Sequence, residues 1–172
     1  MGLPFGYTLK GKGVMPDDHP QNYGLIGQHG KTATNRAMEN ADFVLMIGCN
    51  GDDRAFLNPN NYTGGKTAII NPYTVNVLAR FPVDYVVASD SFLALTELLK
   101  ILHGNGQHEK LREWNSGIRR NYDGEDTYNV LQDGMSPVDL MRGIDAQFNP
   151  DILVLDVGEH QMHAAKLVGL KS

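Results

Sequence analysis

The most constraining feature of the sequence is the stretch 41–54, ADFVLMIGCNGDDR, in which an apolar run leads directly into a polar turn with two glycines. The apolar residues at 43–47 do not alternate with polar ones, which favours a parallel strand covered on both faces. Open α/β sheets place their ligand crevices at the carboxyl ends of such strands. Asp52, Asp53 and Arg54 therefore either contact a ligand or fix the loop through a local ion pair, and we favour the ion pair.

Composition narrows the class of protein. The chain has 172 residues, enough for one domain and part of a second, and a hydrophobic content of 41% supports a buried core. Its formal net charge is −5, which argues against nucleic-acid and membrane partners because both favour basic surfaces. The single cysteine, Cys49, has no second thiol in the chain, and no apolar run approaches the ~20 residues of a membrane span. The first residues lack the features of a secretory signal, so we expect a cytoplasmic protein.

Apolar runs bounded by turn residues predict the strands, which fall at 3–9, 43–47, 67–70, 85–88 and 152–157. Helix or loop crossovers separate these runs, as in a parallel sheet. Residues 10–30 are dense in Gly, Pro, Asp and Asn and are predicted to be a loop. A loop of this length inside a compact domain usually has a function. The prediction is an α/β fold with a Rossmann-like parallel sheet.

The predicted helices carry recognisable start signals. Thr32 is the predicted N-cap of a helix with alanines and Met38 on one face, and one of the polar residues at 89–91 caps the next helix. Residues 107–122 form a charged surface helix with one narrow apolar face. Ser136 as N-cap and Pro137 at the first helical position open a further helix, and another follows at 159–168. The predicted organisation is a central domain over 1–103, a helix and linker over 104–135, and the beginning of a second α/β unit over 136–172.

Two glycine-containing segments, at 24–32 and 61–67, approach the P-loop pattern, but Leu25 and Asn60 stand at the positions where the pattern requires a glycine. We reject both as phosphate-binding loops. The six histidines show no spacing typical of a zinc site. His160 and His163, three residues apart on a helix, could meet a metal ion, but we favour one histidine in a binding turn and the other at the surface. No metal ligand is predicted.

The segment Val157-Gly158-Glu159-His160 joins a predicted strand to a predicted helix. Unpaired N–H groups and the helix dipole make such a helix start a site for an anion. Glu159 opposes a bare anion, so either a metal ion mediates or the carboxylate points elsewhere. From the residues alone, phosphate binding and an ordinary strand-to-helix turn remain equal alternatives.

Three stretches carry a wider pattern: LKGKGVMPDDHPQNYGLIGQHG at 9–30, NRAMENADFVLMIGCNGDDR at 35–54 and DVGEHQMHAAK at 156–166. Together they resemble the thiamine-diphosphate-dependent enzymes of the acetolactate synthase group. The first two are similar to the central domain of that family, and the third resembles the opening of its diphosphate-binding domain, commonly GQHQMWAAQ. The spacing between the stretches also fits, so the resemblance covers nearly the whole chain.

The resemblance implies cofactor contacts at two places. It assigns the diphosphate of thiamine diphosphate, held through magnesium, to Val157, Gly158, Glu159 and His160, with Glu159 replacing the usual glutamine. It assigns a structural FAD to Thr8, Leu9, Ile26, Gln28, His29, Gly48, Asn50 and Asp52. Asn50, Asn71 and Ser89 depart from the family's usual arginine, glutamate and glycine, which argues against FAD retention. The family's activating glutamate and its metal-binding GDG segment match nothing in this chain, so no catalytic residue is assigned.

The resemblance thus implies a fragment or subunit of an enzyme that decarboxylates a 2-oxo acid and can ligate the product to another carbonyl. This chain would supply a scaffold and part of the diphosphate pocket, within a homo-oligomer or beside a complementary chain that carries the missing domains. Two alternatives stay open: a catalytically inert remnant or assembly module that binds a nucleotide or a partner, and one chain of a split enzyme.

Overall fold

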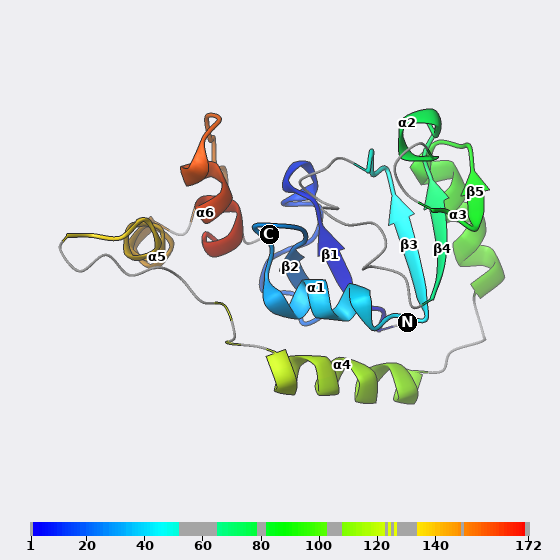
Figure 1. Cartoon of the computed structure of the whole chain (residues 1–172), viewed down its shortest axis with the longest axis horizontal. Coiled ribbons are helices and arrows are strands. Elements are labelled where there is room, and N and C mark those ends of the chain that lie inside the picture. The colour runs from blue at the N-terminus through cyan, green and yellow to red at the C-terminus, as the bar shows by residue number, and fades with distance from the viewer. Residues whose placement is uncertain are drawn as a thin grey trace.

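The computed structural model describes residues 2–51, 65–78, 82–102, 108–122, 124, 126, 134–148 and 150–170. Its strands are β1 (Phe5–Tyr7), β2 (Asn22–Leu25), β3 (Phe43–Ile47), β4 (Lys66–Ile70) and β5 (Tyr85–Val87). Its helices are the short η1 (Leu9–Gly11), α1 (Thr32–Glu39), α2 (Val75–Leu78), α3 (Ser91–Leu102), α4 (His108–Tyr122), α5 (Pro137–Phe148) and α6 (Glu159–Leu167). Figure 1 shows α5 and α6 on one side of β1 and β2, and β3, β4 and β5 on the other.

Every strand pairing in the described residues is parallel. β1 pairs with β2, and β4 lies between β3 and β5 in a separate sheet. The register of the second sheet runs from Phe43 opposite Lys66 to Ile47 opposite Ile70. Ile69 of β4, the middle strand of this sheet, is fully buried. The predicted α/β fold with parallel strands is confirmed, and the apolar runs at 43–47, 67–70 and 85–88 are strands.

Two predictions about the strands of the first half are wrong. The region 10–30 is not all loop, because β2 lies within it and all four of its residues are buried. β3 is not covered on both faces, since Phe43 and Ile47 are 49% and 40% exposed. The better-covered strand is β4, which lies between β3 and β5 and has four of its five residues buried.

The predicted buried strand at 152–157 is also wrong. Within the described residues this segment pairs with no strand, and Ile152 and Val154 are 82% and 89% exposed. Leu153 and Leu155 instead turn inward and pack against the cluster formed by α5 and α6. The segment is therefore unpaired, and its side chains alternate between the α5 and α6 cluster and solvent. Apolar side chains alone supply no partner for the backbone hydrogen bonds of a strand.

The helix starts show one wrong and two correct predictions. Thr32 is not the N-cap of α1, because Lys31 occupies that extended position and Thr32 is the first helical residue. The Asp90 carboxylate caps α3 by accepting the N–H groups of Phe92 and Leu93 at 2.9 and 3.2 Å. Ser136 Oγ caps α5 by accepting the Asp139 N–H at 3.1 Å. The predictions for α3 and α5 are confirmed.

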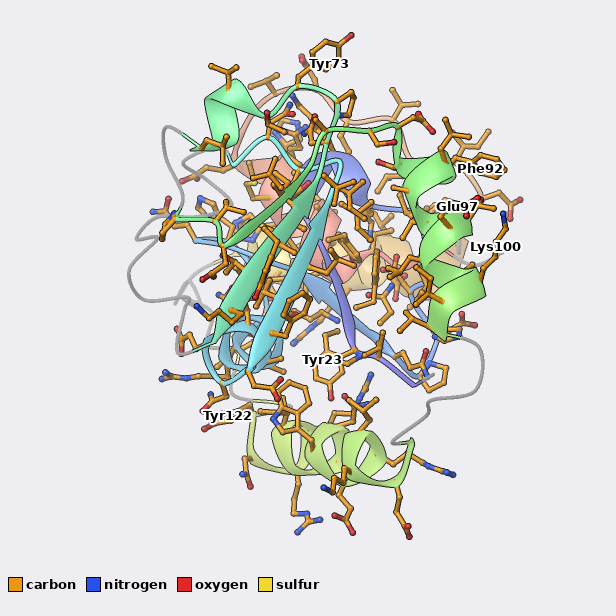
Figure 2. All side chains as sticks on the ribbon, turned by 90° about the vertical axis from the view of Figure 1, so that its right-hand side faces the viewer. Tyr23, Tyr73, Phe92, Glu97, Lys100 and Tyr122 are labelled. Atoms are coloured by element: carbon orange, nitrogen blue, oxygen red, sulfur yellow. The ribbon has the colours of Figure 1, made fainter. Side chains whose placement is uncertain are left out.

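Helix α4 packs through one narrow apolar face, as predicted, and the structure shows that this face lies on α1 and β2. Ile118 is buried among Tyr23 and two alanines of α1, with Trp114 and Tyr122 beside them. The Tyr23 hydroxyl donates to the Asn115 carbonyl oxygen at 2.9 Å, and Figure 2 shows this ring pointing at α4. No helix of the described part is both long and apolar enough to cross a bilayer.

Candidate diphosphate site

The predicted diphosphate residues lie at the exposed start of α6. Gly158 occupies the N-cap position, and no side chain of the described residues caps the helix. Val157, Gly158, Glu159 and His160 are all exposed. The first turn of α6 therefore presents backbone N–H groups with partial positive charge to solvent. Glu159 is the acidic residue of that turn, so its carboxylate opposes a bare anion.

Small side chains allow α6 to pack closely on both of its neighbours. Ala164 and Ala165 are completely buried. Ala165 belongs to the cluster of Tyr7 and Leu25 from β1 and β2, whereas Ala164 belongs to the cluster of α5. Helix α6 is thus held between the first sheet and α5, as Figure 1 shows.

A partly buried carboxylate, Asp17, fastens the chain just beyond α6 to the loop after β1. Asp17 accepts hydrogen bonds from the Tyr7 hydroxyl, the Lys12 ammonium and the Leu170 N–H, each at 2.8 Å. The Asp17 N–H donates in turn to the Leu170 carbonyl oxygen at 3.0 Å. Burial alone would raise the pKa of Asp17, but these hydrogen bonds outweigh it and hold the pKa below its usual value. Burial, together with the bond to Asp17, raises the pKa of Tyr7.

A second carboxylate joins three parts of the chain. Asp126 Oδ1 accepts the N–H and the hydroxyl of Thr32 at 2.9 and 3.0 Å, which satisfies the start of α1. The same oxygen lies 3.1 Å from the Lys166 ammonium of α6. Burial alone would raise the pKa of Asp126, but the bonds from Thr32 and Lys166 hold it below its usual value. Asp126 therefore ties α6 to α1.

The described residues of the predicted flavin site lie near the carboxyl ends of parallel strands. Thr8 and Leu9 follow β1, Ile26 follows β2, and Gly48 follows β3. Leu9 and Ile26 turn into hydrophobic clusters and serve the core. Gln28, His29, Gly48 and Asn50 are exposed, and Asp52 lies outside the described residues. The structure thus places the described positions after the carboxyl ends of β1, β2 and β3 but uses Leu9 and Ile26 for packing.

Residues 1–98 match the family of the thiamine pyrophosphate enzyme, central domain. The chain belongs to this family. The predicted resemblance is therefore confirmed, and the parallel sheets are those of a thiamine pyrophosphate enzyme central domain.

Curated relatives extend the match beyond the central domain. The acetolactate synthase of Mycobacterium bovis is 29% identical over 177 residues, which cover 97% of this chain and 28% of that protein. The acetolactate synthase large subunit of Lactococcus lactis is 28% identical over 175 residues, which cover 99% of this chain and 30% of that protein. The acetolactate synthase isozyme 3 large subunit of Escherichia coli is 28% identical over 173 residues, which cover 96% of this chain and 30% of that protein. The chain spans less than a third of these relatives.

In this thiamine pyrophosphate enzyme central domain, Asn71 locks the loops that follow β3 and β4. Asn71 is buried, and its amide donates to the Cys49 carbonyl oxygen at 2.9 Å and to Asn50 Oδ1 at 3.4 Å. Its side-chain oxygen accepts the Tyr73 N–H at 2.8 Å. Asn71, which stands where the family usually has a glutamate, therefore uses its side chain to hold these two loops together.

Sequence reasoning missed the two carboxylates that hold α6. Asp17 sits in a loop rich in acidic and proline residues, and its partner Leu170 is 153 positions away. Asp126 sits in the predicted linker, 94 positions from Thr32. No local pattern announces such distant partners. The described residues contain no group of three or more His, Cys, Asp or Glu side chains placed to hold a metal ion.

Proposed function

We propose that the chain is part of a thiamine-diphosphate-dependent enzyme of the acetolactate synthase type, acting on a 2-oxo acid. It contributes the central-domain scaffold and, at the start of α6, part of the diphosphate pocket. The observation that carries the proposal is the start of α6 at Gly158, which no described side chain caps. It is supported by the similarity to acetolactate synthases, which extends over nearly the whole chain and includes this helix.

The residues fit the diphosphate only in part. The N–H groups of the first turn suit phosphate oxygens, and the N-cap residue Gly158 has no side chain that could cover them. Glu159 adds a negative charge, so we propose that magnesium accompanies the diphosphate. The bound cofactor supplies the carbanion chemistry, and this chain's residues bind and orient it.

The first test is calorimetric titration of the chain with thiamine diphosphate and magnesium. We expect weak binding that is lost in Gly158→Trp and kept in Gly117→Trp, because a Cβ at Gly117 meets no atom within 4 Å. Equal affinity of both variants would place the diphosphate elsewhere and contradict the proposal.

We expect no turnover of pyruvate by the 172-residue chain supplied with thiamine diphosphate and magnesium. The resemblance assigns the activating glutamate and the metal-binding segment to regions that these 172 residues do not match. A coupled assay of product formation tests this expectation against the Gly158→Trp variant. Turnover above that control would mean that the chain carries catalytic groups of its own.

We expect FAD to bind weakly or not at all. Asn71 already uses its amide on Cys49 and Asn50, and Asn50 and Ser89 replace the arginine and glycine usual in the family. The measurement is the visible spectrum of the purified chain after incubation with FAD and gel filtration. A yellow protein with stoichiometric flavin absorbance would contradict the expectation.

We propose further that residues 136–172 carry a contact with a second copy of the chain. Ile152, Val154 and Val157, three apolar residues within a stretch of six, are between 78% and 89% exposed, and extended exposed apolar surface usually marks an interface. We expect light scattering to give the mass of a dimer and Val154→Lys to reduce it toward the monomer.

Val14→Lys is the matched control for this contact, because Val14 is 74% exposed on the first loop. This variant should leave the dimer intact. A wild-type chain that stays monomeric at high concentration, or dissociation caused equally by both variants, would argue against a contact through 136–172.

A further inference from the structure

Helix α6 is anchored at its carboxyl-terminal end by two carboxylates that come from different parts of the chain. Asp126, which lies between α4 and α5, reaches Lys166 in the last turn of the helix. Asp17, from the loop after β1, holds Leu170 just beyond it. Both carboxylates are also bonded to the central domain, through Thr32 and Tyr7 respectively.

These contacts are more protected from solvent than ordinary surface ion pairs. The side chains of Lys12 and Asp17 are 9% and 17% exposed, and those of Lys166 and Asp126 are 13% and 21% exposed. Charge-assisted hydrogen bonds in such surroundings are about twice as strong as neutral ones. Removal of either carboxylate also leaves half-buried N–H donors without their acceptor, which is costly.

The anchors act at one end of a short rigid rod. Helix α6 has nine residues, so its two ends are about 13 Å apart at ~1.5 Å per residue. Between the ends, the buried Ala164 and Ala165 set the distance to the neighbouring elements. Fixing the last turn therefore also fixes where the first turn, with Gly158 and Glu159, points.

We infer that Asp17 and Asp126 are positioning residues, which hold α6 on the central domain and so aim its first turn at the diphosphate. This role rests on the proposed function of that turn. Neither carboxylate needs to touch the cofactor, and both act through α6. The geometry makes the central domain more than a spacer, because it sets the orientation of a cofactor-binding helix that belongs to the next unit of the chain.

The test compares Asp126→Ala, Asp17→Ala and Lys166→Ala in the 172-residue chain with Glu97→Ala as control. Glu97 forms an exposed ion pair with Lys100 on α3, and Figure 2 shows both side chains on the outer surface. Hydrogen exchange of residues 159–167 reports the docking of α6, and titration with thiamine diphosphate and magnesium reports the first turn. Near-UV circular dichroism verifies that each variant is folded.

We expect about tenfold faster exchange of α6 in Asp126→Ala and Asp17→Ala, the size expected for the loss of a charged hydrogen bond, together with weaker cofactor binding. Glu97→Ala should change neither readout. In the double variant, the effects of Asp126→Ala and Lys166→Ala on the exchange of α6 should be non-additive, because each substitution removes the same contact. Asp126→Asn, which keeps an acceptor for Thr32 but loses the charge, should fall between wild type and Asp126→Ala.

The two proposals fail in different ways. Unchanged exchange of α6 in both aspartate variants would overturn the positioning role, whatever the cofactor does. Faster exchange with unaltered cofactor affinity would also overturn it, because docking would then be purely structural. A wild-type chain that binds no cofactor, although its α6 exchange responds to both variants, would instead overturn the proposed diphosphate site.

Discussion

Replacing Gly65 by alanine is expected to destabilise the fold by about 3 kcal/mol or more, at or above the upper end of the usual range for overpacking. A Cβ at this position would lie 2.5 Å from the Ala41 carbonyl oxygen and closer still to the carbonyl of Asp42. These are backbone atoms, so no side-chain rotation can relieve the overlap. The Asp42 carbonyl also accepts the Lys66 N–H at 2.8 Å, which holds the entries of β3 and β4 together.

Urea denaturation of Gly65→Ala, compared with that of Gly143→Ala, separates the overlap with the backbone from the general effect of replacing glycine by alanine. Gly143 lies within α5, where a Cβ meets no atom within 4 Å, so alanine there should stabilise the helix by roughly 0.5–1 kcal/mol. A loss of stability in Gly65→Ala together with a gain in Gly143→Ala would support the close approach of β3 and β4. A Gly65→Ala variant as stable as wild type would show that the two strands do not start as closely as described.

Truncation of Ile69 to alanine is expected to cost about 2–5 kcal/mol, the range for a buried large-to-alanine change. Ile69 is 0% exposed and packs between Met38 of α1 and Met46 of β3. The cavity would open in β4, the middle strand of its sheet, where a strand on each side limits collapse. The free energy of unfolding from urea titration, with an unchanged m-value, measures the loss.

Ile101→Ala is the matched control, because the same side chain on α3 is 72% exposed. Its effect should stay within about 0.5 kcal/mol, as for most surface substitutions. If the two variants lost equal stability, the core would not be centred on β4.

The sequence predicted best where one local pattern decides the structure. The apolar runs at 43–47 and 67–70 became β3 and β4, and Asp90 and Ser136 cap their helices. It failed where distant partners decide. The four residues NYGL of β2 contain an asparagine and a glycine and lie in a stretch dense in turn-forming residues, and they are buried by α1, α4 and β1. By contrast, the strongly apolar 152–157 segment pairs with no described strand.

The same division holds for the candidate site. The glycine before a helix start at Gly158 is a local pattern and was found. The anchors Asp17 and Asp126 depend on contacts across most of the chain, and even the cap of α1 comes from Asp126 rather than from Thr32. Residue types and spacing alone do not predict partners at such separations.

The most direct test of the central claim, that the start of α6 holds the diphosphate of thiamine diphosphate, is a nuclear magnetic resonance titration of the isotope-labelled chain. Thiamine diphosphate with magnesium should shift the amide signals of Gly158, Glu159 and His160 first, and unphosphorylated thiamine with magnesium should leave them in place. Shifts confined to other residues, or equal shifts with thiamine, would contradict the claim.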